Sequence, residues 1–185
     1  KLIENLQFVE VNEFTIFGRI PKIGTSIEKN ILAKVFKQHR LQTFLDTKGK
    51  PIYYRTTGGR YFKVVTNYPT GSTKEKPLFF EKKLTNAIGC VLSSSLAFWF
   101  YQIYSNNLDW KTYEIENFTI PQLSPDNVES LEKLYSRYLI DIEANANIRS
   151  TSGESTYNVE SFKEYKIVRS KAIIDEIDDY LCPLY

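Results

Sequence analysis

Three stretches of the chain repeat apolar residues at the spacing of an amphipathic helix, with polar side chains between them. The first covers residues 26–39 and follows Thr25, with Glu28 three positions later, which is the pattern of a capping box. The other two cover residues 126–147 and 170–181, and their remaining sides are acidic and polar. Each stretch is therefore predicted to be a helix that buries one face and leaves the other in solvent.

The most apolar run, residues 87–104, reads AIGCVLSSSLAFWFYQIY. Its length approaches that of a membrane span, but it contains a glycine, three serines and a glutamine, and it lacks basic flanks arranged for insertion. We therefore predict a buried core helix, with Cys90 as a small buried hydrophobe, and no membrane as a partner.

Segments rich in Val, Ile, Thr, Tyr and Phe predict strands. Residues 6–20 predict one or two strands, and residues 113–120 predict another that ends before Pro121. Connections are predicted in the polar segments at residues 46–50, 69–77 and 147–158.

A β-hairpin is predicted in the stretch KPIYYRTTGGRYFK, residues 50–63, which contains no carboxylate. Residues 51–55 and 60–65 read as its two strands, and residues 56–59 join them. The Gly58-Gly59 pair can supply the positive φ values of a tight turn, and alternation sends neighbouring side chains to opposite faces.

These elements predict an α+β fold, with a mixed or antiparallel sheet, packed helices and a helical C-terminal part. The chain has 185 residues, which is enough for one domain with a hydrophobic core. We expect residues 1–121 to form the α+β part and residues 122–185 to form a helical support segment of the same domain. Because the chain begins with Lys and contains no Met, we interpret it as part of a longer protein.

The net charge of +2 conceals a strong asymmetry along the chain. Residues 48–83 contain nine Lys and Arg against two acids, whereas residues 109–185 contain eight against fifteen. Positive charge gathered in one segment indicates a directed electrostatic face that suits a polyanion. The alternative is an ordinary solvated basic loop, because runs of charge are most often surface.

The residue types needed for several kinds of catalysis are missing or scattered. His39 is the one histidine, and it stands in the basic helix end KQHR, where it suits the helix dipole better than general-base chemistry. Cys90 and Cys182 form neither a CxxC pair nor a disulfide framework, so we expect no zinc site and a reducing, cytoplasmic location. The glycine pair lacks the spacing and the following helix of a phosphate loop.

Two short triplets resemble fragments of metal-dependent nucleases. Glu81-Lys82-Lys83 and Glu164-Tyr165-Lys166 both place a glutamate two positions before a lysine. Such triplets arise often by chance, and a metal site needs a ligand geometry that spacing alone does not provide. A nuclease using Glu81 or Glu164 therefore stays a minor alternative.

The order of five motifs carries a family resemblance. The chain reads IPKIGTSIEKNILAKVF at residues 20–36, IYYRTTGGRYFKV at 52–64, LSSSLAFWFYQIYSNNLDW at 92–110, ENFTIP at 116–121 and YKIVRSKAIIDEIDDYLCPLY at 165–185. In this order they resemble the C-terminal target-recognition region of type IIG-like fused restriction–modification enzymes and related phage-defence methyltransferases. Those proteins have an N6-adenine DNA methyltransferase domain upstream, and the resemblance covers nearly the whole chain.

The resemblance implies a module similar to the specificity-subunit domains of type I systems. Such a module is an α+β domain followed by helices that pack on a partner or on the methyltransferase, and it binds double-stranded DNA to read a short sequence. The NPPY-type tetrapeptide and the glycine-rich S-adenosylmethionine motif of the parent enzymes do not occur here. We therefore expect this segment to bind no cofactor or metal and to catalyse nothing. S-adenosylmethionine would bind the upstream methyltransferase domain of the same protein, with or without a fused endonuclease.

The predicted DNA face combines cations, tyrosines and amides, because Lys and Arg bind phosphates and a two-stranded ribbon fits the major groove. Its core is the hairpin, in which the two glycines let the tip approach the duplex closely. Phosphate contacts are expected from the next loop, and further hydrogen bonds from an Asn pair. The predicted DNA-binding residues are Tyr53, Tyr54, Arg55, Gly58, Gly59, Arg60, Tyr61, Lys63, Lys74, Lys76, Asn106 and Asn107.

Two alternatives remain for this hairpin. Its aromatic side chains can simply pack on a helix, in which case one face is structural and the other stays free. In addition, a protein-interaction domain could use the basic aromatic hairpin to dock an acidic partner, and it would show little salt-sensitive binding to DNA.

Overall fold

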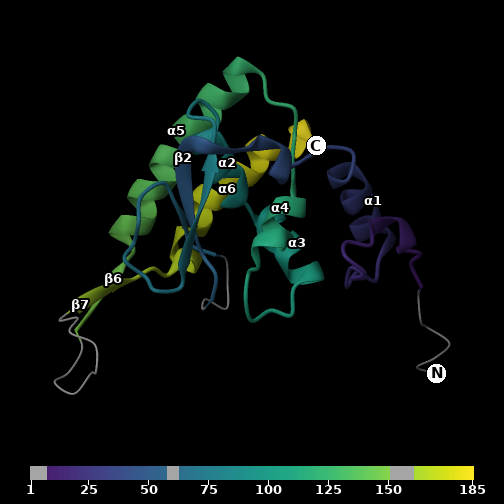
Figure 1. Cartoon of the computed structure of the whole chain (residues 1–185), viewed down its shortest axis with the longest axis horizontal. Helices are drawn as coiled ribbons and strands as arrows, with labels where there is room; N and C mark the ends of the chain where they lie inside the picture. Colours follow the sequence, from purple (N-terminus) through teal and green to yellow (C-terminus); the bar gives the residue numbers. More distant parts are fainter. Residues whose placement is uncertain (1–7, 58–62, 151–160) are drawn as a thin grey trace.

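The structure, a computed structural model, describes residues 8–57, 63–150 and 161–185 (Figure 1). It is an α+β fold with antiparallel sheets and packed helices, as predicted. The helices are α1 Ser26–Val35, α2 Thr85–Leu92, α3 Ser95–Tyr104, α4 Thr112–Asn117, α5 Pro125–Ala144 and α6 Lys171–Leu181. The strands are β1 His39–Arg40, β2 Leu45–Arg55, β3 Val65–Thr66, β4 Glu75–Phe80, β5 Thr119–Ile120, β6 Asn147–Ser150 and β7 Ser161–Glu164. Short 3-10 turns are η2 Asn12–Phe14, η3 Leu41–Phe44, η4 Ile167–Ser170 and η5 Cys182–Leu184.

The main sheet has the strand order β3-β2-β4, and both pairings are antiparallel. Strand β2 lies in the centre, and its burial alternates: Ile52 and Tyr54 point into the core, whereas Tyr53 and Arg55 are half-buried on the other side. This alternation confirms the strand predicted at residues 51–55.

Strand β2 also continues through residues 46–50, where a turn was predicted. Both Leu45 and Lys50 lie opposite Phe80, so the strand makes an irregularity at this point instead of reversing the chain. Gly49 permits this arrangement, because a Cβ atom there would lie 1.9 Å from the Phe80 carbonyl oxygen. The backbone of β4 therefore occupies the space that any side chain at position 49 would need.

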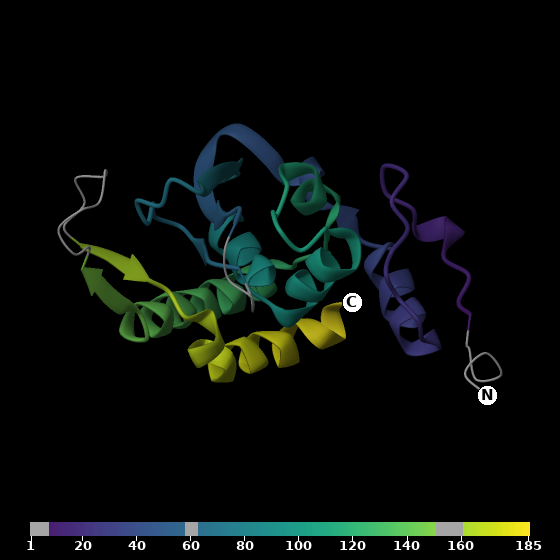
Figure 2. The same ribbon diagram turned by 90° about the horizontal axis from the view of Figure 1, so that it is seen from below.

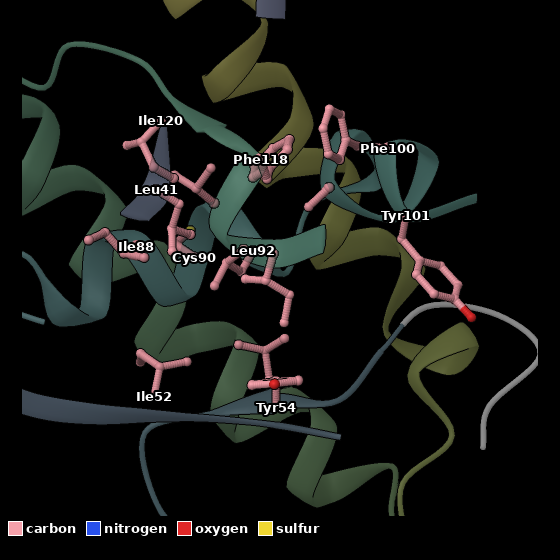
Figure 3. Packing of buried hydrophobic residues seen from close by; sticks show 14 of the residues in the cluster. Leu41, Ile52, Tyr54, Ile88, Cys90, Leu92, Phe100, Tyr101, Phe118 and Ile120 are labelled. Carbon is pink, nitrogen blue, oxygen red and sulfur yellow. The ribbon is translucent and has the colours of Figure 1, made fainter. Parts of the chain in front are cut away.

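Helix α2 packs against the sheet and against α5 and α6 (Figure 2). Gly89 allows the close approach of α5, since a Cβ at this position would lie 2.6 Å from the ring of Tyr135. Figure 3 shows Ile52 and Tyr54 of β2 on one side of α2 and Phe118 and Ile120 on the other. The hydrophobic core thus includes residues from both the 1–121 and the 122–185 segments.

The helices with clear start signals begin within one residue of the predicted positions, although α1 and α5 end three or four residues before the predicted ends. Thr25 caps α1, with its hydroxyl accepting from the Glu28 backbone NH and the Glu28 carboxylate accepting from the Thr25 NH. Helix α5 begins at Pro125 behind the cap residue Ser124, and α6 ends at Leu181 as expected. These signals are local, so they work without knowledge of the tertiary fold.

The single helix predicted at residues 87–104 is wrong, because the chain breaks into α2 and α3 with a bend of 63°. Ser94 causes the break, since its hydroxyl accepts from the Ala97 NH and so caps a new helix. Among the described residues, no single helix is long and apolar enough to cross a membrane, whereas α2 and α3 together meet that criterion by length and composition alone.

Residues 113–120 are mostly helical, contrary to the predicted strand. Glu114 stabilises the first turn of α4 by accepting from the Lys111 backbone NH at 3.0 Å, and only Thr119–Ile120 forms a strand, β5. Strand β5 pairs with β1, which contains His39. The expected location of His39 at a helix end is also wrong, because α1 ends at Val35.

The strands predicted at residues 6–20 do not form within residues 8–20, where the structure shows the turn η2 and an isolated Ile16–Arg19 bridge. The loop predicted at residues 147–158 begins instead with β6, which pairs with β7. Together β6 and β7 form a two-stranded arm that extends from the end of α5 (Figures 1 and 2).

Candidate nucleic-acid interface

The hairpin predicted around Gly58-Gly59 is described only at its two flanks, because residues 58–62 lie outside the described residues. Strand β2 ends at Arg55, β3 begins only at Val65, and they pair through Tyr53–Thr66 and Tyr54–Val65. Of the second strand predicted at residues 60–65, residues 63–65 are described, and Val65 alone of these belongs to β3, although the Arg55 NH also donates to the Val64 carbonyl at 3.0 Å. Four of the predicted site residues, Gly58, Gly59, Arg60 and Tyr61, lie outside the described residues.

A groove of about 720 Å³ lies beside the end of β2. It is formed by the end of β2, the chain that enters β4, and the segment that leads from α3 into α4. The residues that line it are Thr56, Thr57, Thr73, Lys74, Lys76, Asp109, Trp110, Lys111, Thr112, Tyr113 and Glu116. Lys74, Lys76 and Lys111 are exposed, so the groove has cations on two of its walls.

Thr56 fixes the three segments relative to one another. Its backbone NH donates to the Lys74 carbonyl at 2.7 Å, and its hydroxyl donates to the same oxygen at 2.9 Å. Its own carbonyl accepts from the Trp110 NH at 2.7 Å, and an antiparallel bridge joins Thr57 to Asp109. The predicted phosphate contacts Lys74 and Lys76 are thereby brought next to the segment that follows α3.

Tyr54 lies in the core rather than on the predicted DNA face, which corrects that expectation. Only 1% of its surface is exposed, and its ring meets Trp110 edge-on at 5.7 Å. Its hydroxyl lies 2.8 Å from the Thr112 hydroxyl, and burial raises the pKa of the phenol. Tyr54 therefore supports the floor of the groove from below.

Lys63 is also buried, with 6% of its surface exposed, so it does not line an open face. Its ammonium lies 4.4 Å from the centre of the Tyr101 ring, a cation–π geometry. Burial lowers the pKa of Lys63, while the Asp109 and Glu114 carboxylates act in the opposite direction. This position does not fit the expectation that Lys63 contacts DNA, because its ammonium is enclosed next to the Tyr101 ring.

Tyr53 and Arg55 lie on the outer side of β2, where both are half-buried. The Arg55 Nε is enclosed and has no hydrogen-bond partner among the described residues. Arg55 is opposite Glu75 in the β2–β4 register. Both side chains therefore keep only part of their surface for a ligand.

The predicted pair Asn106 and Asn107 is exposed on the loop between α3 and α4, which we call the recognition loop and define as residues 105–109. The Asn106 side-chain oxygen accepts from the backbone NH of Leu108 at 3.1 Å. The Ser105 hydroxyl accepts from the Asn107 NH at 3.1 Å and donates to the Asp109 carbonyl at 3.0 Å. This loop is consequently held in one shape beside the groove.

Ion pairs and hydrogen bonds fix the base of the recognition loop. The Lys22 ammonium donates to the Ser105 carbonyl at 2.5 Å, and Arg19 approaches the buried Glu114 carboxylate at 3.9 Å. Lys111 and Tyr113 also line the groove, but neither was among the predicted site residues. Tyr113 was predicted in a strand, whereas in the structure Lys111 is the N-cap residue of α4 and Tyr113 lies in its first turn.

The two nuclease-like glutamates are engaged in ion pairs. Glu81 lies 3.0 Å from Lys83, and Glu164 accepts from Lys166 and Arg149. Hydrogen bonds from Lys166 and Arg149 lower the pKa of the Glu164 carboxyl to about 2. Among the described residues, no group of three or more His, Cys, Asp and Glu side chains could hold a metal ion.

Comparisons of the chain with protein-family models, with curated proteins and with solved structures give no match.

Proposed function

We propose that the chain is the target-recognition domain of a restriction–modification protein with an N6-adenine DNA methyltransferase, and that it binds double-stranded DNA. The observation that supports this proposal most directly is the groove, which is lined by the exposed Lys74, Lys76 and Lys111 and lies beside a loop with two exposed amides. Exposed lysines bind phosphates and set the position of a duplex, whereas amides can contact base edges.

The distribution of acidic residues supports the same orientation. Helices α5 and α6 lie on the side of the molecule opposite β2 (Figure 2). Their exposed faces contain acids such as Asp126, Glu129 and Glu176. Like charge keeps these faces away from a phosphate backbone, so the groove side is the one that would meet DNA.

In this proposal the finer fold is similar to the specificity-subunit domains of type I systems. Helices α5 and α6 support the sheet or contact the upstream methyltransferase domain, which would bind S-adenosylmethionine. The protein would work in the cytoplasm, and the segment itself would read DNA without catalysing a reaction.

The test is the salt dependence of DNA binding, because each neutralised phosphate steepens it. Replacing Lys74, Lys76 and Lys111 together by Ala should reduce the slope of log K against log salt concentration by about 2.7, at about 0.9 per lost phosphate contact. When KCl is raised from roughly 50 to 200 mM, the variant should therefore lose about 40-fold less affinity than the wild type loses. Fluorescence anisotropy with a labelled random-sequence duplex measures both slopes.

The matched control removes three other exposed or half-exposed lysines and so has the same net charge. Lys29, Lys133 and Lys171 lie away from the groove and pair with Glu13, Glu129 and Asp175. This control should keep the wild-type slope. Equal slopes for the groove variant and the wild type would refute the DNA assignment. Tight binding of poly-glutamate in place of DNA would favour the protein-interaction alternative.

A further inference from the structure

Two neighbouring side chains of the recognition loop, Asn107 and Leu108, point away from the body of the protein. Asn107 is exposed, and 70% of the Leu108 surface is exposed although Ser105 and Trp110 on either side are buried. Single exposed leucines are common on protein surfaces and need no explanation by themselves. What distinguishes Leu108 is the way in which the chain around it is held.

The loop is rigid because its hydrogen bonds use main-chain atoms of both residues. The Asn107 NH donates to the Ser105 hydroxyl, and the Leu108 NH donates to the Asn106 side-chain oxygen. Asn107 has φ 62°, in the left-handed region that asparagine adopts more readily than most residues. The cost of this conformation is offset by the surrounding bonds, and its effect is to turn two consecutive side chains outward.

The side chains of Asn106 and Asn107 differ in their hydrogen bonding. The Asn106 side chain folds back to accept from the NH groups of Leu108 and Asp109, at 3.1 and 3.4 Å. The structure gives the Asn107 side chain no hydrogen-bond partner within the described part of the chain, so its donor and acceptor face solvent. Asn106 therefore shapes the loop, and Asn107 is the residue that can meet a ligand.

The position of the loop relative to the lysines identifies that ligand. Trp110 and Asp109 attach the loop to Thr56 and Thr57, and Thr56 in turn holds the Lys74 carbonyl. In Figure 1 the loop connects α3 to α4 and extends below these two helices. A duplex whose phosphates lie against Lys74, Lys76 and Lys111 would meet the projecting pair at one of its grooves.

We propose that Asn107 and Leu108 determine sequence specificity by entering the minor groove of DNA, with Leu108 as a wedge between base pairs and Asn107 as the reader of the adjacent pair. This inference rests on the proposed function. Proteins that bind the minor groove combine the same two elements: amides that distinguish A·T from G·C, and apolar wedges such as leucine that unstack one base step. The fixed loop would avoid the entropy cost of ordering these side chains on binding.

The experiment uses the full 185-residue chain and a duplex pool with a randomised centre. Selection with the wild type should yield a preferred sequence, which is then labelled with 2-aminopurine at each step in turn. At one step we expect the fluorescence to rise on binding, since unstacking relieves quenching. Leu108→Ala should abolish this rise and weaken binding by about tenfold or more, within the range of one lost base-pair contact.

Asn107→Gly tests the reader separately, because glycine keeps the positive φ without strain while removing the amide. This variant should lose the preference at a single A·T pair and keep the wild-type salt slope. Ile140→Ala removes an equally exposed aliphatic side chain from α5 and serves as the control, with unchanged affinity and fluorescence. Unchanged urea midpoints establish that the variants are folded. If Leu108→Ala is not folded, Leu108→Gln takes its place as the test of the apolar side chain.

The outcomes separate the two proposals. If the wild type binds and selects a sequence, but Leu108→Ala and Asn107→Gly behave like the wild type, the inference about the loop is overturned and the proposed function stands. If the wild type shows no salt-dependent binding to duplex DNA, both are overturned.

Discussion

Tyr54 provides the sharpest test of how the core supports the candidate interface. It was predicted to contact DNA, but the structure places its ring against Trp110 and its hydroxyl beside Thr112. Two substitutions separate these contacts. Tyr54→Phe removes the hydroxyl alone, and Tyr54→Ala removes the whole ring from a site that is 1% exposed.

The expected losses of stability follow from these contacts. A neutral hydrogen bond contributes about 1 kcal/mol, which is the expected cost of Tyr54→Phe. Truncating a buried aromatic side chain to alanine costs about 3–5 kcal/mol, and this includes the edge-to-face contact with Trp110. Since small domains are stable by about 5–15 kcal/mol, the alanine variant loses a large part of the total.

Urea unfolding measures both effects. With a slope of about 2 kcal/mol per molar, the midpoint should fall by about 0.5 M for Tyr54→Phe and by about 1.5–2.5 M for Tyr54→Ala. The DNA affinity of the folded phenylalanine variant should stay within about twofold of wild type, because its ring still supports Trp110. An unchanged midpoint together with a tenfold loss of DNA affinity would refute the reasoning, since it would place the hydroxyl on the ligand.

Two further predictions concern the sheet and the arm. Gly49→Ala should destabilise the fold by about 3 kcal/mol, since its Cβ would meet the main chain of Phe80 and the strands cannot rotate away. Gly24→Ala, with nothing within 4 Å of the new atom, is the control; equal urea midpoints for the two variants would contradict this view of β2. Burial alone would raise the pKa of the Glu143 carboxyl, but hydrogen bonds from Lys163, Tyr165 and Tyr68 outweigh it and lower the pKa from 4.5 to about 2. The contribution of Glu143 to stability is therefore present above pH 4.5 and is lost as the pH falls toward 2. Glu143→Gln should be less stable than wild type at neutral pH, and the difference in unfolding free energy should shrink across this window; a constant difference would exclude the ionised carboxylate as its cause.

The parts of the fold that were predictable from the sequence are those encoded by neighbouring residues. The Thr25–Glu28 capping box and the apolar stripes of α5 and α6 require only contacts within a few positions, and they were found. The burial of Cys90 also followed from the apolar run around it.

The errors occur where a distant contact decides between two local patterns. The segment around Ile115 and Phe118 suits a short helix as well as a strand, and only the Leu41–Phe118 hydrogen bond and the β1–β5 pairing show which part is extended. The break between α2 and α3 depends on whether Ser94 points along a helix or caps a new one.

Of the residues predicted for the site, Lys74 and Lys76 line the groove, but the arrangement of the groove did not follow from the sequence. Alternation in β2 correctly separates Tyr53 from Tyr54, but a period of two does not state which of the two faces a helix covers. The groove also depends on residues from three separate segments, and their meeting at Thr56 is a tertiary property. For the same reason Lys111 and Tyr113 could not be assigned to it from spacing.

The recognition loop has a consequence for how readily its exposed surface could be varied. Asn107 and Leu108 are fixed through their amide NH groups, while Ser105 and Asn106 supply the side chains that hold them. Either projecting side chain can therefore be exchanged without loss of these bonds, provided that position 107 accepts a positive φ. A combinatorial library at these two positions would vary the side chains offered to a ligand while the backbone of the loop stays the same. New binding preferences could therefore arise from one or two substitutions without a change of fold.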